Sequence, residues 1–145
     1  MGEWADDDYE LFWAADEGYL YAGMRAATAG WVALDIEPSS AMKDADMIIG
    51  LVRGAEVEVY DLFARGRFGP HPPDTELGGS DDILEYGGSE QDGSTVIEFK
   101  RALDTGDQYD HPLARGERYR ILWAYGDSDE PGEKHTRRGK GEIRL

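Results

Sequence analysis

The chain of 145 residues contains no cysteine. Disulfide bonds, thiolate metal sites and the Cys-x-x-Cys-His attachment of a c-type haem are therefore excluded. No run approaches the roughly 20 apolar residues of a membrane helix, and no segment resembles the apolar stretch of a secretory signal. Because hydrophobic residues still make up 40% of the sequence, we expect one globular domain over residues 1–145, without direct insertion into a membrane.

Basic residues are also scarce. The 15 basic residues face 31 acidic ones, which gives a formal net charge of −16. Such a surface repels nucleic acid and anionic membranes. It suits a high-salt environment, where screening weakens self-repulsion, so a halophilic origin is one interpretation. A docking face for a cationic partner is the other.

Short segments of alternating apolar and polar residues recur along the chain, separated by glycine-rich turns such as Asp16-Glu17-Gly18 and Asp92-Gly93. This period of two predicts β-strands. No stretch of about eleven residues keeps a helical period, so we expect little or no helix and a β-sandwich of about nine strands. The expected strands are Tyr9–Ala15, Tyr19–Ala26, Trp31–Ile36, Met47–Val52, Val57–Ala64, Ile83–Gly88, Thr95–Arg101, Arg118–Tyr125 and Glu142–Leu145.

A thioether and an imidazole stand out against this background. Met42 lies among polar residues between two expected strands, whereas Met24 and Met47 fall inside strand patterns and are expected in the core. His135 lies in a polar loop before the last strand. Met and His together are known axial ligands of haem iron, and without cysteine such a haem is non-covalent haem b. The alternatives are that Met42 fills a gap and that His135 is a surface residue.

Other candidate sites have weaker support. His71 and His111 each precede proline, which favours extended surface loops. The long polar segment Arg65–Asp82 predicts a loop that is functional or stabilised by an ion. A metal-dependent enzyme around His71, Asp74 and Asp81 is a third-ranked hypothesis. No phosphate-binding loop, serine nucleophile elbow or His-Glu-x-x-His motif is present, and we expect a protein that is not an enzyme.

Four sequence blocks resemble the DOMON domain family. They are Gly30-Trp-Val-Ala-Leu34, the segment Met42–Gly50, the segment Phe99–Asp110, and Ile121-Leu-Trp-Ala-Tyr-Gly126, in the order and spacing of that family. Together they cover nearly all of the chain. The resemblance implies an immunoglobulin-like antiparallel β-sandwich, in agreement with the strand pattern.

The resemblance also implies a function. Cytochrome-type DOMON domains, such as that of cellobiose dehydrogenase, hold haem b with a Met after the Gly-Trp strand and a His before the final strand, and Met42 and His135 match these positions. The implied function is electron transfer to a redox partner protein or a fused redox domain. The implied location is extracytoplasmic (secreted, periplasmic or membrane-tethered), with a signal that is not present in this chain.

Related domains of the dopamine β-hydroxylase type carry no haem. There, a cation is held by acidic residues that match Asp46 and Asp82, with backbone carbonyls near Met47 and Leu62, so the resemblance implies a second site for Ca²⁺ or Na⁺. The alternative function is a non-catalytic module that binds a sugar, another small ligand or a partner. Its exposed aromatic side chains would come from Trp4, Trp13, Tyr19 and Tyr21.

Overall fold

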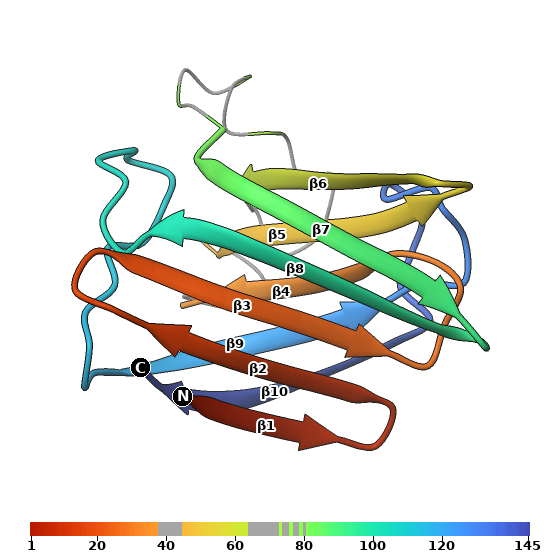
Figure 1. Cartoon of the computed structure of the whole chain (residues 1–145), viewed down its shortest axis with the longest axis horizontal. Coiled ribbons are helices and arrows are strands. Elements are labelled where there is room, and N and C mark those ends of the chain that lie inside the picture. The colour runs from red at the N-terminus through yellow and green to blue at the C-terminus, as the bar shows by residue number, and fades with distance from the viewer. Residues whose placement is uncertain (38–44, 64–72, 74–75, 77–78, 80) are drawn as a thin grey trace.

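The computed structural model is a sandwich of two five-stranded antiparallel sheets (Figure 1). It describes residues 1–37, 45–63, 73, 76, 79 and 81–145. Sheet A has the order β1 (Gly2–Asp6), β2 (Tyr9–Ala15), β3 (Tyr19–Ala26), β8 (Ser94–Ala102) and β7 (Ile83–Gln91). Sheet B has the order β10 (Arg137–Arg144), β9 (Arg118–Tyr125), β4 (Val32–Ile36), β5 (Asp46–Arg53) and β6 (Glu56–Phe63).

The predicted fold class is confirmed. The described residues form ten strands and no α-helix, and the described ranges contain no helix with the length and apolar character that a bilayer crossing requires. The sequence missed β1, because Gly2–Asp6 alternates only weakly. The predicted turn at Asp92-Gly93 joins β7 to β8 with both residues at positive φ, 54° and 75°, as a tight hairpin turn requires.

The main core lies between the two sheets. Its members come from the inward faces of the strands other than β1 and β7, and include Leu11, Met24, Leu34, Ile36, Ile48, Ile97, Phe99, Ile121 and Trp123. The ring of Tyr9 stacks on Trp123 at 4.9 Å, and its hydroxyl donates to the Ala33 carbonyl at 2.9 Å. A bond across the sandwich of this kind fixes how sheet A sits on sheet B.

A second buried cluster lies on the opposite face of sheet B. It consists of Trp31, Ala33, Ala45, Met47, Ile49, Leu51 and Leu62. Strands β4 and β5 are therefore buried on both faces, which explains their nearly continuous apolar sequences. The expected burial of Met24 and Met47 is confirmed.

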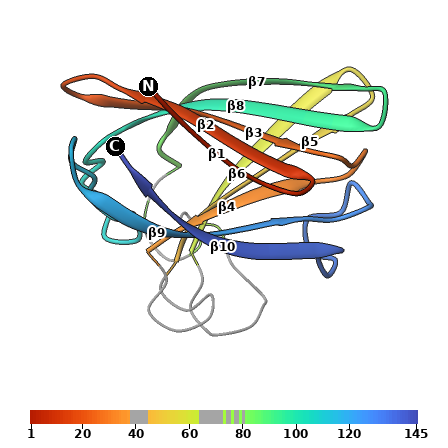
Figure 2. The ribbon, with the colours of Figure 1, turned by 90° about the horizontal axis from the view of Figure 1, so that it is seen from below.

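The two ends of the sandwich differ in construction. Figure 2 shows the two sheets edge-on. We call one the hairpin end: it carries the turns after β1, β5 and β7, the link from β3 to β4, and residues 126–136 between β9 and β10. The other is the loop end, where the chain leaves β4, β6 and β8. The register assigns the strand ends: Val32 pairs with Tyr125 at the hairpin end, and Ile36 pairs with Ile121 and Asp46 at the loop end.

Candidate functional site

A cluster of buried carboxylates lies at the loop end. Asp46 opens β5, Asp61 lies on β6, and Asp110 lies between β8 and β9; they are 0%, 5% and 8% exposed. Carboxylate oxygens of these three residues lie within 4.8 Å of one another. A second trio at the same spacing consists of Asp82, Asp107 and Asp110, so Asp110 joins the two groups. Four separate segments of the chain therefore bring acidic oxygens to one place.

Arg101 supplies the positive charge inside this cluster. Its guanidinium forms a buried ion pair with Asp46, in which the two side chains are 2% and 0% exposed. It also donates to the His111 carbonyl at 3.0 Å, and the His111 amide donates to Asp46 Oδ2 at 3.1 Å. The Asp46 Oδ2 atom thus accepts two hydrogen bonds. Asp46 Oδ1 is buried, and no described residue forms a hydrogen bond with it.

Burial changes the acidity of these carboxyls. It raises the pKa of Asp61 to about 8, with Asp110 and Asp46 adding to the effect, while the Asp82 amide opposes it by donating to Asp61 Oδ2 at 2.9 Å. Burial also raises the pKa of Asp46, against the attraction of Arg101. Because the pKa of Asp61 is raised to about 8, this carboxyl retains its proton at neutral pH unless a cation takes its place.

An oxygen-only donor set of this kind suits a hard cation such as Ca²⁺ or Na⁺. The predicted ligands Asp46 and Asp82 both belong to the cluster, connected through Asp61. Met47 and Leu62, whose carbonyls were predicted to help, are register partners next to Asp46 and Asp61. The structure therefore brings the four predicted residues to one region.

The predicted cation ligands did not include Asp61, Asp107 and Asp110. One signal was available for Asp61: it shares the inward face of β6 with Val57, Val59 and Phe63, and its register partner is Ile48. An acidic residue on the apolar face of an alternating strand is unusual. For Asp110 no local pattern exists, because its position depends on a loop closing against a distant strand.

For the predicted haem ligands, the structure describes His135 and the strands on either side of Met42. Met42 lies outside the described residues. The strands on either side of it, β4 and β5, meet at the loop end, where Ile36 pairs with Asp46. His135 lies in the connection from β9 to β10 at the hairpin end, where the amide of Thr136 donates to the Tyr125 carbonyl at 2.8 Å.

The environment of His135 favours a neutral imidazole. The side chain is partly buried, and burial together with Arg138 lowers its pKa. A neutral imidazole is the form that ligates iron. Because Met42 lies outside the described residues, ligation by Met42 and His135 stays a prediction. His71 and Asp74 also lie outside the described residues.

Comparisons with known proteins decide the family. The DOMON domain model matches residues 5–126, which is most of the chain. The chain belongs to the DOMON family. DBH-like monooxygenase protein 1 of Homo sapiens is 30% identical over 148 residues, covering 97% of this chain and 23% of the human protein. The Mus musculus protein of the same name is 31% identical over 94% of the chain and 22% of its own length. This DOMON domain thus spans under a quarter of these relatives.

Solved structures share the fold of this DOMON domain. The cytochrome domain of Myriococcum thermophilum cellobiose dehydrogenase aligns with a TM-score of 0.67 at 13% identity, over 99% of this chain and 81% of that one. The cytochrome b domain of pyranose dehydrogenase from Coprinopsis cinerea aligns with a TM-score of 0.64 at 17% identity, over 94% and 75%. The predicted resemblance to DOMON domains is confirmed.

Proposed function

We propose that this DOMON domain is a non-catalytic binding domain whose loop end holds a hard cation, Ca²⁺ or Na⁺. One observation carries the proposal: Asp46 Oδ1 is buried without a hydrogen-bond partner among the described residues, inside a cluster that includes Asp61 and Asp110. A buried polar atom without a partner is costly, and a coordinated cation would remove that cost. In this proposal Asp46, Asp61 and Asp110 are the nearest ligands, and Asp82 with the Met47 and Leu62 carbonyls completes the predicted set.

A cation at this position would act as a structural clamp. Asp46, Asp61 and Asp110 come from β5, β6 and the connection between β8 and β9, while Asp82 immediately precedes β7. Binding would replace the proton on Asp61 and link the β5–β6 hairpin to the connection between β8 and β9 and to the start of β7. Modules outside the cell bind Ca²⁺ with dissociation constants of about 10⁻⁴–10⁻³ M, which agrees with the proposed extracytoplasmic location.

In this proposal, the cation-binding domain is one part of a larger protein. Its relatives among the monooxygenase proteins are more than four times as long as the matched region. We therefore place it as an accessory domain next to a redox partner protein or a fused redox domain, with chemistry carried out elsewhere.

Thermal unfolding with and without Ca²⁺ tests the cation. At free Ca²⁺ one hundred times Kd, binding adds about 2.7 kcal/mol of stability, a rise in Tm of roughly 5–10 °C over EDTA. Asp110→Asn should remove most of this rise. The matched control is Asp127→Asn, at an exposed position between β9 and β10, which should keep it. An equal Tm in Ca²⁺, in high NaCl and in EDTA with choline chloride of the same ionic strength would reject the site.

Electron transfer by haem b is a second candidate, favoured by the shared fold with two cytochrome b domains. In this candidate Met42 and His135 are the axial ligands, and haem would supply one-electron redox chemistry. The test is a haemin titration of the purified chain, followed by the Soret band. Sharp low-spin reduced bands that disappear in Met42→Ala and in His135→Ala would support the candidate, with His111→Ala as control. A wild type that leaves the haemin spectrum unchanged rejects haem without affecting the cation proposal.

A further inference from the structure

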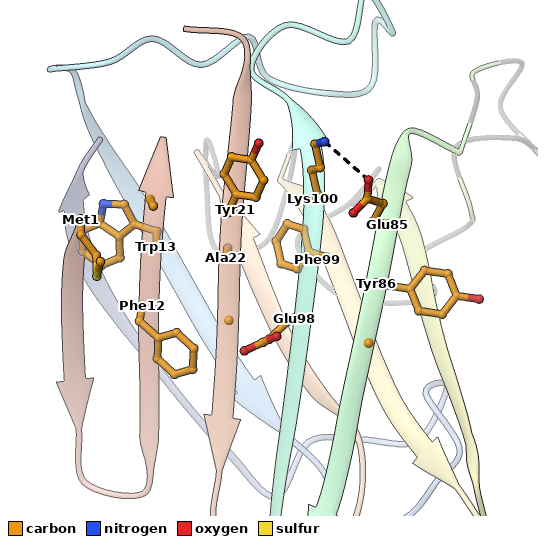
Figure 3. A pocket seen from close by; sticks show the side chains of 13 residues that line it. Met1, Phe12, Trp13, Tyr21, Ala22, Glu85, Tyr86, Glu98, Phe99 and Lys100 are labelled. Atoms are coloured by element: carbon orange, nitrogen blue, oxygen red, sulfur yellow. Dashed lines mark ion pairs between the residues drawn. The ribbon is translucent and has the colours of Figure 1, made fainter. Parts of the chain in front are cut away.

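The outer face of sheet A carries a groove of about 510 Å³ (Figure 3). Unlike the carboxylate cluster, this groove is lined by aromatic rings. Its central row crosses four strands: Phe12 pairs with Gly23, Gly23 with Glu98, and Glu98 with Gly87. The two glycines of this row add no side chains of their own, and the space at Gly87, which we call the hollow, stays open.

The two glycines have different surroundings. The Phe12 ring lies over Gly23, so closely that a Cβ there would be 2.0 Å from its Cε2 atom. At Gly87 a Cβ would meet nothing within 4 Å. Figure 3 shows the Glu98 side chain leaning from β8 toward β3, on the side of β8 where Phe12 lies. A ligand in the hollow would therefore meet a flat aromatic ring on one side and a carboxylate beside it.

The neighbouring row of the same face already holds an ammonium ion. The Lys100 nitrogen lies 4.4 Å from the ring centroid of Tyr19 and 5.5 Å from that of Tyr21, and 3.5 Å from Glu85. The Tyr21 hydroxyl donates to Asp16 at 3.1 Å, which fixes its ring. Aromatic faces plus a carboxylate are a favourable environment for an alkylammonium or guanidinium group. The contacts of Lys100 are therefore an example, within this chain, of a cationic side chain held by aromatic rings and a carboxylate.

Glu98, unlike Glu85, forms no ion pair with Lys100. It is exposed, and no hydrogen bond or ion pair to it is found among the residues that the structure describes. The charge of Lys100 is offset by Glu85, so the carboxylate of Glu98 remains available to a ligand. The net charge of −16 adds a long-range attraction for cations.

We propose that this groove binds a lysine or arginine side chain presented by a basic segment of a partner protein. The cationic head would lie over Phe12 and Tyr21 and pair with Glu98, while the glycine hollow takes the aliphatic stem. This site is separate from the cation site at the loop end and does not depend on it. A neutral sugar would also fill a groove with aromatic walls, but it would not need the negative charge of Glu98.

An NMR titration of the whole chain with a synthetic peptide containing four lysines tests this proposal. Glu98→Gln should weaken binding about tenfold, as loss of an ion pair next to an aromatic ring predicts. The matched control is Glu56→Gln in the exposed hairpin between β5 and β6. It changes the net charge equally and should weaken binding less than twofold. Gly87→Val fills the hollow where space is open, so it should keep Tm and also weaken binding about tenfold.

Two outcomes would overturn the proposal. Equal weakening by Glu98→Gln and Glu56→Gln would show that the peptide is attracted only by the overall charge. Shifts at Phe12 and Tyr21 with neutral disaccharides, undiminished in Glu98→Gln, would make the groove a sugar site. A peptide in which glutamates replace the lysines should cause no shifts.

Discussion

The two ends of the sandwich are closed by different kinds of interaction. At the hairpin end the backbone does most of the work: the Trp31 amide donates to the Ser128 carbonyl at 3.0 Å, and the Gly126 amide donates to the Trp31 carbonyl at 3.0 Å. At the loop end, buried charges connect the segments, with Arg101 and Asp46 at the centre. The first kind of closure depends on steric fit, and the second on protonation, ions and complete pairing.

The two ends should therefore respond differently to pH and salt. Backbone hydrogen bonds in tight turns change little with pH or salt, whereas a buried carboxylate cluster responds to both. The ion pairs at the hairpin end, such as those of Arg137 with Asp7 and Asp8, are exposed and contribute little. We therefore expect substitutions at its backbone contacts to act through shape. Substitutions at the loop end should in addition change how the protein responds to cations and to pH.

Arg101→Met should give the largest loss of stability. It leaves Asp46 buried without its ion-pair partner, while Met fills a similar volume. Removing one partner of a buried pair costs about 3–5 kcal/mol. Urea unfolding measures the loss. The control is Arg118→Met, because Arg118 pairs with Glu142 where both side chains are more than half exposed, and such pairs contribute about 0–1 kcal/mol. Similar costs for the two variants would contradict the central role of the buried pair.

Gly30→Ala should produce the next largest effect, at the hairpin end. A Cβ on Gly30 would lie 2.1 Å from the Gly126 carbonyl oxygen and 2.5 Å from that of Ser128. Both are backbone atoms, so the connection must shift, at a cost of about 1–3 kcal/mol. Gly18→Ala is the matched control, because a Cβ there meets nothing within 4 Å. The loss for Gly30→Ala should be the same in Ca²⁺ and in EDTA; a loss that depends on Ca²⁺ would mean that the two ends are coupled.

The sequence predicted the hairpin end better than the loop end for a physical reason. Turns such as Asp92-Gly93 are encoded by neighbouring residues, and alternation along β8 and β9 follows directly from the pleat of a strand. Strand β1 was missed because its side chains gain burial only from distant partners. Trp4, for example, lies over Gly141 of β10. Local patterns cannot predict contacts of that kind.

The candidate site shows the same limit. Asp46 and Asp82 came from the family resemblance, and the residues that complete the cluster come from segments far apart in the chain. Arg101 and Asp46, 55 residues apart, meet only because the two sheets stack. The expected pairing of Met42 with His135 assumed that their loops share one end. Strand direction governs that assumption, and the period of two does not reveal strand direction.

A pH series in EDTA would sharpen the comparison with a smaller effect. The folded-state pKa of Asp61 is about 8, well above the unfolded value near 3.9. The folded chain then binds a proton that the unfolded chain releases, so the stabilisation is full at low pH and is lost as pH rises toward 8. Tm should fall between pH 5 and pH 8. Asp61→Asn should reduce this fall by about half, because Asp35, which is also buried and has a pKa of about 8, contributes similarly. Saturating Ca²⁺ should reduce it as well. An unchanged slope in Asp61→Asn would mean that other groups cause the fall.

His135→Ala should give the smallest effect, at the hairpin end. The side chain is only partly buried, and the bond that positions this segment is made by the backbone of Thr136. Surface substitutions of this kind change stability by about 0.5 kcal/mol or less, and the change should be equal in Ca²⁺ and in EDTA. The informative measurement is the same variant with haemin added. If His135 ligates iron, haemin raises the Tm of the wild type and not of the variant, because only the folded wild type binds the ligand. Equal Tm values for both proteins with haemin would leave His135 as a surface residue and the hairpin end as a purely structural closure.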